Sequence, residues 1–138
     1  MRVLLDTDVV LDFVLEREPF VEAAGALFEL IARGVCDGYI SAVTPLNVFY
    51  IGRKLKGAAQ TKQSISDLLA AVRVCPVDGD ILHHALALPF ADYEDATQYA
   101  CATANGLDAI VTRNLDDYKN VSLPVFSPTD FLDHLKSL

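Results

Sequence analysis

The chain has 138 residues, of which 52% are hydrophobic and 22% are charged, and this balance excludes a disordered chain. A chain of this length can bury its own core, so we expect one domain over residues 1–138. The formal net charge of −8 argues against a large non-specific nucleic-acid surface, because such surfaces need clustered Lys and Arg. The apolar runs are too short to cross a bilayer, and Asp6 and Asp8 interrupt the first run too early for a signal peptide. We therefore expect a cytoplasmic protein without membrane contact.

The first predicted element is a strand. Val3, Leu4 and Leu5 form an unbroken apolar run that ends at Asp6, which is typical of a strand buried on both faces of a parallel sheet. Further strands are expected over residues 36–42, 74–77, 109–112 and 125–126. The strand over 74–77 is expected at a sheet edge, because Pro76 cannot donate a ladder hydrogen bond.

Apolar residues at helical spacing separate these strands. Thr44 and Pro45 predict a helix start with Thr44 as N-cap, and Ser127-Pro128-Thr129-Asp130 predicts the start of the last helix. Helices are expected over residues 9–15, 20–33, 45–56, 59–72, 80–88 and from 92 to a cap at Gly106. Strands alternating with helices predict a three-layer α/β/α fold with a mostly parallel five-stranded sheet.

The cysteines and histidines indicate no metal site. Cys36, Cys75 and Cys101 lack Cys-x-x-Cys spacing and lie in apolar surroundings, so we expect buried thiols in a reducing compartment. The three histidines show no zinc-binding pattern.

Three pairs of acids lie where the chain leaves a strand or enters a helix: Asp6 with Asp8, Asp92 with Asp95, and Asp116 with Asp117. If the fourth strand lies beside the first, the three pairs converge on one crevice. Other roles stay open for each pair. Asp8 and Asp92 are also good helix caps, Asp95 complements a helix dipole, and the last two acids suit a solvated loop.

Converging carboxylates need either protons or a cation. At about 4 Å they repel one another by roughly 4 kcal/mol at an effective dielectric constant near 20. Oxygen ligands without Cys or His favour Mg²⁺ or Mn²⁺. A metal site of this kind suits phosphodiester hydrolysis, because the metal activates water and stabilises the charge that develops on the phosphate. The net charge of −8 also attracts cations, so we expect a partner to insert a basic side chain into the crevice.

Four segments, taken together, resemble the PIN-domain family over essentially the whole chain. They are Leu4 to Asp12, Ser41 to Thr44, Asp92 to Ala96 and Thr112 to Tyr118, and the end of the chain from Val125 to Leu132 also looks like that of many members. The resemblance implies a metal-dependent ribonuclease with Mg²⁺ or Mn²⁺. Many such proteins are the toxin of a toxin-antitoxin pair of the VapC type, dimeric and held inactive by a small partner protein.

Carried over to this chain, the resemblance implies roles for particular residues. Asp6 would be the central metal ligand, Asp95 the second and Asp117 the acid of the last motif. Supporting residues would be Asp8, Asn47, Asp92, Thr112 and Asn114, with Thr112 and Asn114 lining the crevice. The chain departs from the family at three of these positions. Asn47 stands where most members have an acid, Asn114 where Asp is frequent, and Asp8 where Asn is usual.

Two alternatives stay open at this point. Asp6-Thr7-Asp8-Val9-Val10 also fits the nucleophile loop of haloacid-dehalogenase-like phosphatases, in which Asp6 would form an aspartyl-phosphate and Asp8 would act as acid and base. The neutral residues Asn47 and Asn114 favour the other alternative, a non-catalytic PIN-like interaction module.

Overall fold

The computed structural model describes residues 1–138. The strands are β1 (Arg2–Leu5), β2 (Asp37–Ser41), β3 (Arg73–Cys75), β4 (Ala109–Val111) and β5 (Val125–Phe126). The α-helices are α1 (Thr7–Val14), α2 (Val21–Ala32), α3 (Thr44–Lys56), α4 (Ala58–Ala71), α5 (Gly79–Leu86), α6 (Tyr93–Ala104) and α7 (Pro128–Lys136), and a 3₁₀ helix, η1, spans Leu115–Tyr118. Every predicted strand and helix is present, with ends that shift by a few residues, whereas η1 was not predicted.

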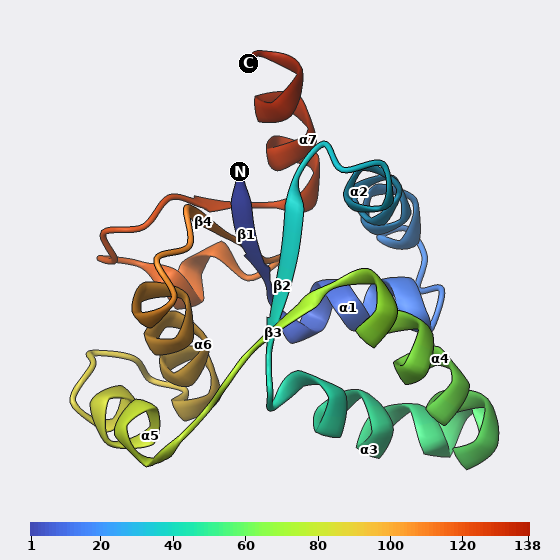
Figure 1. Ribbon diagram of the computed structural model, residues 1–138, viewed down its shortest axis with the longest axis horizontal. Coiled ribbons are helices and arrows are strands. Elements are labelled where there is room, and N and C mark those ends of the chain that lie inside the picture. Colours follow the sequence, from blue (N-terminus) through green and yellow to red (C-terminus); the bar gives the residue numbers. More distant parts are fainter.

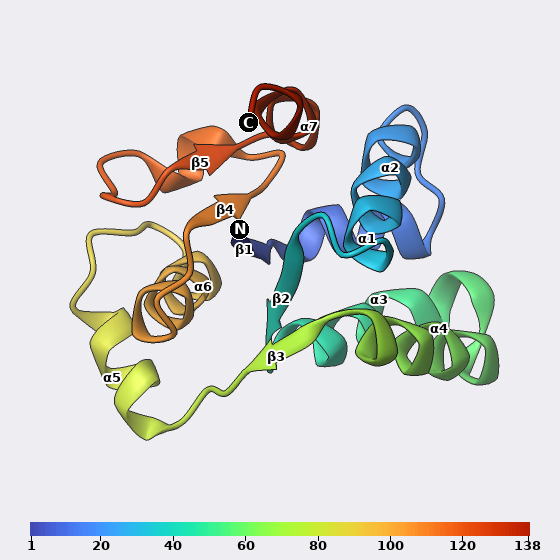
Figure 2. The same ribbon diagram turned by 45° about the horizontal axis from the view of Figure 1, so that its top comes forward.

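The five strands form one sheet in the order β3-β2-β1-β4-β5, and all neighbouring strands run parallel. Helices α5 and α6 cover one face, while α1, α2 and α7, together with the α3–α4 pair, lie on the other (Figures 1 and 2). The predicted three-layer α/β/α fold is thus confirmed. So are the edge position of β3 and the pairing of β4 with β1, which brings the ends of these two strands together.

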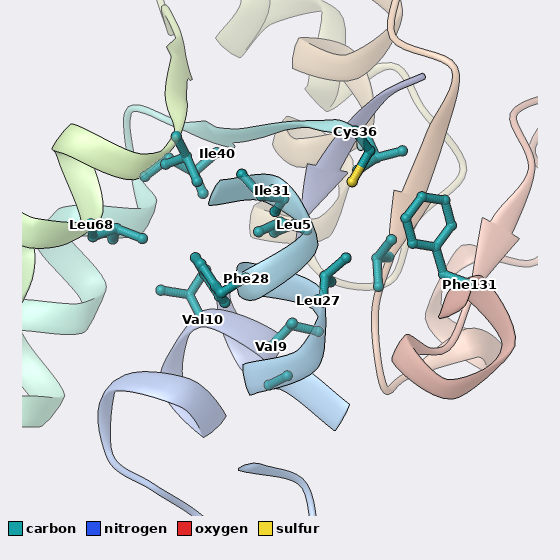
Figure 3. Close-up of a cluster of buried hydrophobic side chains, with 14 of the residues drawn as sticks. Leu5, Val9, Val10, Leu27, Phe28, Ile31, Cys36, Ile40, Leu68 and Phe131 are labelled. Carbon is teal, nitrogen blue, oxygen red and sulfur yellow. The ribbon is translucent and has the colours of Figure 1, made fainter. Parts of the chain in front are cut away.

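Alternate residues of β1 serve the two faces of the sheet. Val3 and Leu5 pack into the larger core with α1, α2, α4 and α7 (Figure 3), and Leu4 packs on the other side against Tyr99 of α6. All three strand residues have no exposed surface. Because β1 is buried on both faces, the backbone that leads into Asp6 has little freedom to move.

The structure corrects the predicted Thr44 cap and rules out Asp8 as the alternative cap of the first helix. Helix α1 begins at Thr7, and its N-cap is Asp6, whose side chain accepts a hydrogen bond from the Thr7 backbone N–H; Asp8 lies in the first turn. Helix α3 begins at Thr44 itself, with Val43 as an N-cap that makes no side-chain hydrogen bond. The Thr44 hydroxyl bonds to a side chain of another helix instead, a contact that local sequence cannot reveal.

Other sequence predictions are confirmed. Asp92 caps α6 and Ser127 caps α7, each by accepting a backbone N–H three residues ahead. The three cysteines are buried and free, and burial raises the pKa of the Cys75 thiol to about 11, which keeps it protonated. None of the helices has both the length and the apolar character that a membrane span requires.

Candidate functional site

A cleft of about 470 Å³ opens where β1 and β4 end and α3 and α6 begin. Most of the side chains that line it are polar or charged: Asp6, Thr7, Asp8, Leu11, Arg17, Asn47, Ile51, Asp92, Glu94, Asp95, Arg113, Asn114 and Asp117. The cleft therefore contains acids from the end of β1, the start of α6 and η1. This is the crevice at the carboxyl ends of the strands where α/β proteins bind ligands.

Asp6 is held by hydrogen bonds on both of its carboxylate oxygens. Oδ1 accepts from the Thr7 backbone N–H (2.8 Å) and from Gln98 Nε2 (3.2 Å). Oδ2 accepts from the hydroxyls of Thr112 (2.8 Å) and Tyr118 (3.2 Å). The residue is only 5% exposed. Four donors around one buried carboxylate fix its position.

Asp8 lies beside Asp6 with one oxygen occupied and one free. Its Oδ2 accepts from the Arg113 backbone N–H and from Asn114 Nδ2, both at 3.1 Å. Its Oδ1 is buried and has no hydrogen-bond partner. Burial, and then the charge of Asp6, raises the pKa of Asp8 to about 6 despite the opposing effect of Arg113. A buried carboxylate oxygen without a donor is a group that a positively charged ligand would stabilise.

The remaining acids surround Asp95 near the start of α6. Asp92 Oδ1 accepts a hydrogen bond from the Asp95 backbone N–H at 3.0 Å, so the cap of this helix also fixes the position of the Asp95 backbone. Burial, followed by the charges of Asp6, Asp92, Asp117 and Glu94, raises the pKa of Asp95 to about 7. Asp117 is exposed on η1. Burial and the neighbouring carboxylates together therefore disfavour the charged form of Asp95.

A polar network connects Thr7 and Glu94, which line the cleft, with the buried side chains of Thr44 and Gln98, and the sequence analysis missed it. The Thr7 hydroxyl donates to Glu94 Oε1 at 3.0 Å and lies 3.1 Å from the Thr44 hydroxyl. Gln98, with no exposed surface, also reaches both threonines, at 3.3 and 3.4 Å. One signal was available, because Glu94 and Gln98 are four residues apart and so share a face of the helix that carries Asp95. Nothing in the sequence around Tyr118 indicated that its hydroxyl would reach Asp6.

The cleft also contains two arginines, which the sequence analysis did not single out. Arg113 donates through Nε (2.6 Å) and Nη2 (3.2 Å) to Asp12, whose side chain is 1% exposed. Arg17 Nε lies 3.1 Å from the same carboxylate without forming a hydrogen bond. The guanidinium carbon of Arg113 is 3.8 Å from the ring centroid of Phe20. One buried acid therefore holds two cations at the edge of the cleft.

The structure brings most of the predicted site residues to this cleft, but two lie elsewhere. Thr112 is fully buried and supports Asp6 from behind, so the expectation that it lines the crevice is wrong. Asp116 is exposed outside the cleft, 3.7 Å from Lys119. A 3₁₀ helix separates the directions of Asp116 and Asp117, because successive side chains point to different sides. Asn47 does line the cleft.

The chemistry of the donors fits a divalent cation such as Mg²⁺ or Mn²⁺. The cleft offers carboxylate oxygens, which these ions prefer, and a cation would relieve the repulsion around Asp95 and satisfy Asp8 Oδ1. No three His, Cys, Asp or Glu side chains close around a single point. Carboxylates without a cation between them repel one another, which keeps them apart. Three of them could therefore hold an ion only after their side chains rotate toward it.

Comparisons with known proteins agree with the fold. A family model described as "PIN domain" matches residues 2–116. The chain is similar to a VapBC2 structure from Rickettsia felis, which was solved bound to a promoter DNA fragment (16% identity, TM-score 0.72, 91% of this chain and 97% of that one). It is also similar to a toxin-antitoxin complex from Klebsiella pneumoniae (22%, 0.70, 91% and 97%). A third similar structure is VapC20 from Mycobacterium tuberculosis, described as a sarcin-ricin loop cleaving toxin (16%, 0.63, 78% and 86%). No curated protein matches the chain.

Proposed function

The chain belongs to the PIN-domain family, and from this membership we propose that it is a metal-dependent endoribonuclease that hydrolyses RNA phosphodiester bonds. The observation that carries the proposal is the acidic cleft, in which acids from three separate segments of the chain meet at the ends of parallel strands. The similar fold of a toxin described as cleaving the sarcin-ricin loop supports RNA as the substrate.

In this proposal Asp6, Asp95 and Asp117 hold Mg²⁺ or Mn²⁺. A bound cation of this kind activates water and stabilises the negative charge that develops on the phosphate. Asp6 is fixed in advance, because four donors already orient its carboxylate. Ligand carboxylates are commonly hydrogen-bonded as well, so these donors are compatible with ligation. Asp95 gains most from a cation, because burial and the neighbouring acids both disfavour its charged form.

Four further residues support these acids and Asp8, which lies beside Asp6. Thr112 orients Asp6, and Asn114 donates to Asp8. Asp92 fixes the first turn of α6. Asn47 offers the cleft a neutral amide, which can orient water or a phosphate but adds no negative charge.

The two alternatives are less well supported. A phosphatase of the haloacid-dehalogenase type is disfavoured, because the family model that matches residues 2–116 is that of the PIN domain. A non-catalytic module is suggested by Asn47 and Asn114, yet six acids still line the cleft and keep it strongly negative: Asp6, Asp8, Asp92, Glu94, Asp95 and Asp117. We therefore retain the nuclease as the proposal.

We further propose that a small antitoxin partner holds the enzyme inactive. Six acids and two arginines line the cleft, so a basic side chain of the partner is the complementary group. The similarity to toxin-antitoxin structures, one of them bound to promoter DNA, supports a complex that also contacts DNA. We propose that the toxin is a cytoplasmic homodimer. Co-purification with a small protein encoded beside it, and sedimentation of the purified chain, test these two proposals.

The nuclease is tested by incubating a mixed single-stranded RNA with the wild type and with Asp6→Asn, in Mn²⁺ and in chelator. Asp133→Asn is the matched control, because it makes the same chemical change on an exposed acid of α7, away from the cleft. We expect cleavage by the wild type and Asp133→Asn in Mn²⁺ only, and none by Asp6→Asn. Thermal unfolding with and without Mn²⁺ reports folding and metal binding independently of activity.

Retained cleavage by a folded Asp6→Asn protein would overturn the role of Asp6. Turnover of a phosphatase substrate without RNA cleavage would favour the phosphatase. If Mn²⁺ leaves the unfolding temperature of the wild type unchanged and no substrate is turned over, the interaction module is the better description.

A further inference from the structure

We propose that Arg17 and Arg113 bind a phosphate next to the one that is cleaved, and that a second hollow behind Arg113 seats the attached nucleotide. The inference rests on the proposed function, because the ligand is the same RNA strand. It adds to that function a binding site, outside the acidic cleft, for the part of the RNA next to the cleaved phosphate.

The second hollow adjoins the cleft through one residue. It has a volume of about 400 Å³ and lies between the start of α2 and the start of α7, which pack side by side in Figures 1 and 2. Arg113 lines both the hollow and the acidic cleft. An RNA strand that has a phosphate in the cleft and continues toward α7 must therefore pass the guanidinium of Arg113.

The charges in the cleft single out the arginines as contacts for RNA. The strand is polyanionic, and the acids in the cleft repel every phosphate that a metal ion does not neutralise. Among the residues that line the cleft, only Arg17 and Arg113 are cationic. A flanking phosphate is therefore most stable on the side of the cleft where these two residues lie.

The arginine pair carries more positive charge than the packing requires. One arginine is enough to neutralise Asp12, and Arg113 already does so with two hydrogen bonds. Arg17 adds a second positive charge, and its Nε has no hydrogen-bond partner. The side chains of Arg17 and Arg113 are 40% and 27% exposed. The group as a whole is thus a net cation that can reach a ligand.

Arg113 is held in a fixed orientation that suits an anion. Asp12 engages one edge of the guanidinium, and the ring of Phe20 covers one of its faces at 3.8 Å. The remaining N–H groups are free to donate to phosphate oxygens. A guanidinium fixed in advance loses little entropy when it binds, and its planar fork matches the phosphate group.

The lining of the second hollow suits a nucleotide. Phe20 is 41% exposed and offers an aromatic surface to a base, and the exposed Thr129 offers a hydroxyl at the start of α7. Stacking on aromatic side chains and contacts with hydroxyls are the usual means by which proteins hold single-stranded RNA. The volume is also within the range of small-ligand sites, about 300–1,000 Å³.

The binding test uses the full-length wild-type protein and a short fluorescent single-stranded RNA, with Ca²⁺ in place of Mg²⁺, because carboxylate oxygens also hold this cation. Arg17→Gln is added to it, because Asp12 keeps Arg113 as its partner and the fold is retained. Arg33→Gln, an exposed arginine at the far end of α2, is the matched control. We expect Arg17→Gln to weaken binding about tenfold, as for other charge-assisted contacts. It should also reduce the slope of log Kd against log salt by about 0.7, the value for one phosphate contact on a single strand.

A second variant tests the hollow without touching the ion pairs. In Phe20→Leu the aromatic face is lost but the Asp12 contacts of both arginines remain. Strands with one abasic nucleotide, placed at each position in turn, locate the base that the hollow holds. We expect one position at which base removal weakens binding to the parent protein but has no effect on Phe20→Leu.

The outcomes separate this inference from the proposed function. If the wild type cleaves RNA, and Arg17→Gln and Arg33→Gln weaken binding equally or not at all, the arginine site is overturned and the nuclease stands. An equal abasic effect in Phe20→Leu and its parent overturns the nucleotide hollow. If the wild type neither binds nor cleaves RNA, the proposed function and the inference both fail.

Discussion

Asp12 offers a sharp test of the ion pairs beside the cleft, through the substitution Asp12→Asn. The amide has nearly the same shape as the carboxylate but no charge, and it places an NH₂ group or a weaker acceptor against two guanidiniums. The contacts at stake are Arg113 Nε at 2.6 Å, Arg113 Nη2 at 3.2 Å and Arg17 Nε at 3.1 Å.

The magnitude follows from burial on each side of the pair. Breaking a fully buried ion pair costs about 3–5 kcal/mol. Asp12 is 1% exposed, but the arginine side chains are 27% and 40% exposed and can regain water. We therefore expect a loss of about 2–3 kcal/mol in the free energy of unfolding. For a domain of this size, that loss lowers Tm by roughly 5–10 °C.

Urea unfolding at neutral pH measures the effect, with Asp116→Asn as the control. Asp116 makes the same kind of pair with Lys119 at 3.7 Å, but its side chain is 90% exposed, so we expect no measurable change there. A loss below about 1 kcal/mol in Asp12→Asn, or equal losses in the two variants, would refute the reasoning that burial makes this pair strong.

Two further predictions concern titration and packing. Asp8 and Asp95 have ordinary pKa values of 3.8 that rise in the folded protein to about 6 and about 7. A carboxyl group whose pKa is raised by folding stabilises the protein at a pH below its unfolded pKa, and this stabilisation is lost as the pH rises through its folded pKa. Because Asn cannot lose a proton, Asp95→Asn should become more stable relative to the wild type as the pH rises from about 4 to about 8. Unfolding in chelator measures this gain, which Mn²⁺ should reduce; a pH-independent difference would contradict it. Gly52→Ala should destabilise the protein by about 1 kcal/mol, because the added Cβ would lie 2.8 Å from Thr61 Cγ2 and overpacking exceeds the gain in helix propensity. Gly79→Ala, with open space around it, should not destabilise; equal effects in thermal unfolding would show that the contact with Thr61 is unimportant.

The sequence by itself determined the elements and their layers. The apolar run from Val3 to Leu5 predicted a doubly buried strand, and the residues at Asp92 and Ser127 predicted helix starts that the structure confirms. These features depend on local propensity, side-chain periodicity and capping, all of which act over a few neighbouring residues. The alternation of strands and helices then restricts the topology to a parallel sheet, so the edge that holds the acids was also predictable.

Only the tertiary structure decided which side chains surround each acid. Thr112 and Tyr118 reach Asp6 from more than 100 residues away, and Asp12 pairs with Arg113 across a similar separation. No local pattern encodes such contacts, because they arise from the pairing of β1 with β4 and from the turn that η1 makes after it. A tertiary contact also explains why Thr44 does not cap its own helix, because its hydroxyl bonds to a side chain of another helix. Helices and strands follow from local forces, whereas the site depends on contacts that form only when the sheet has assembled.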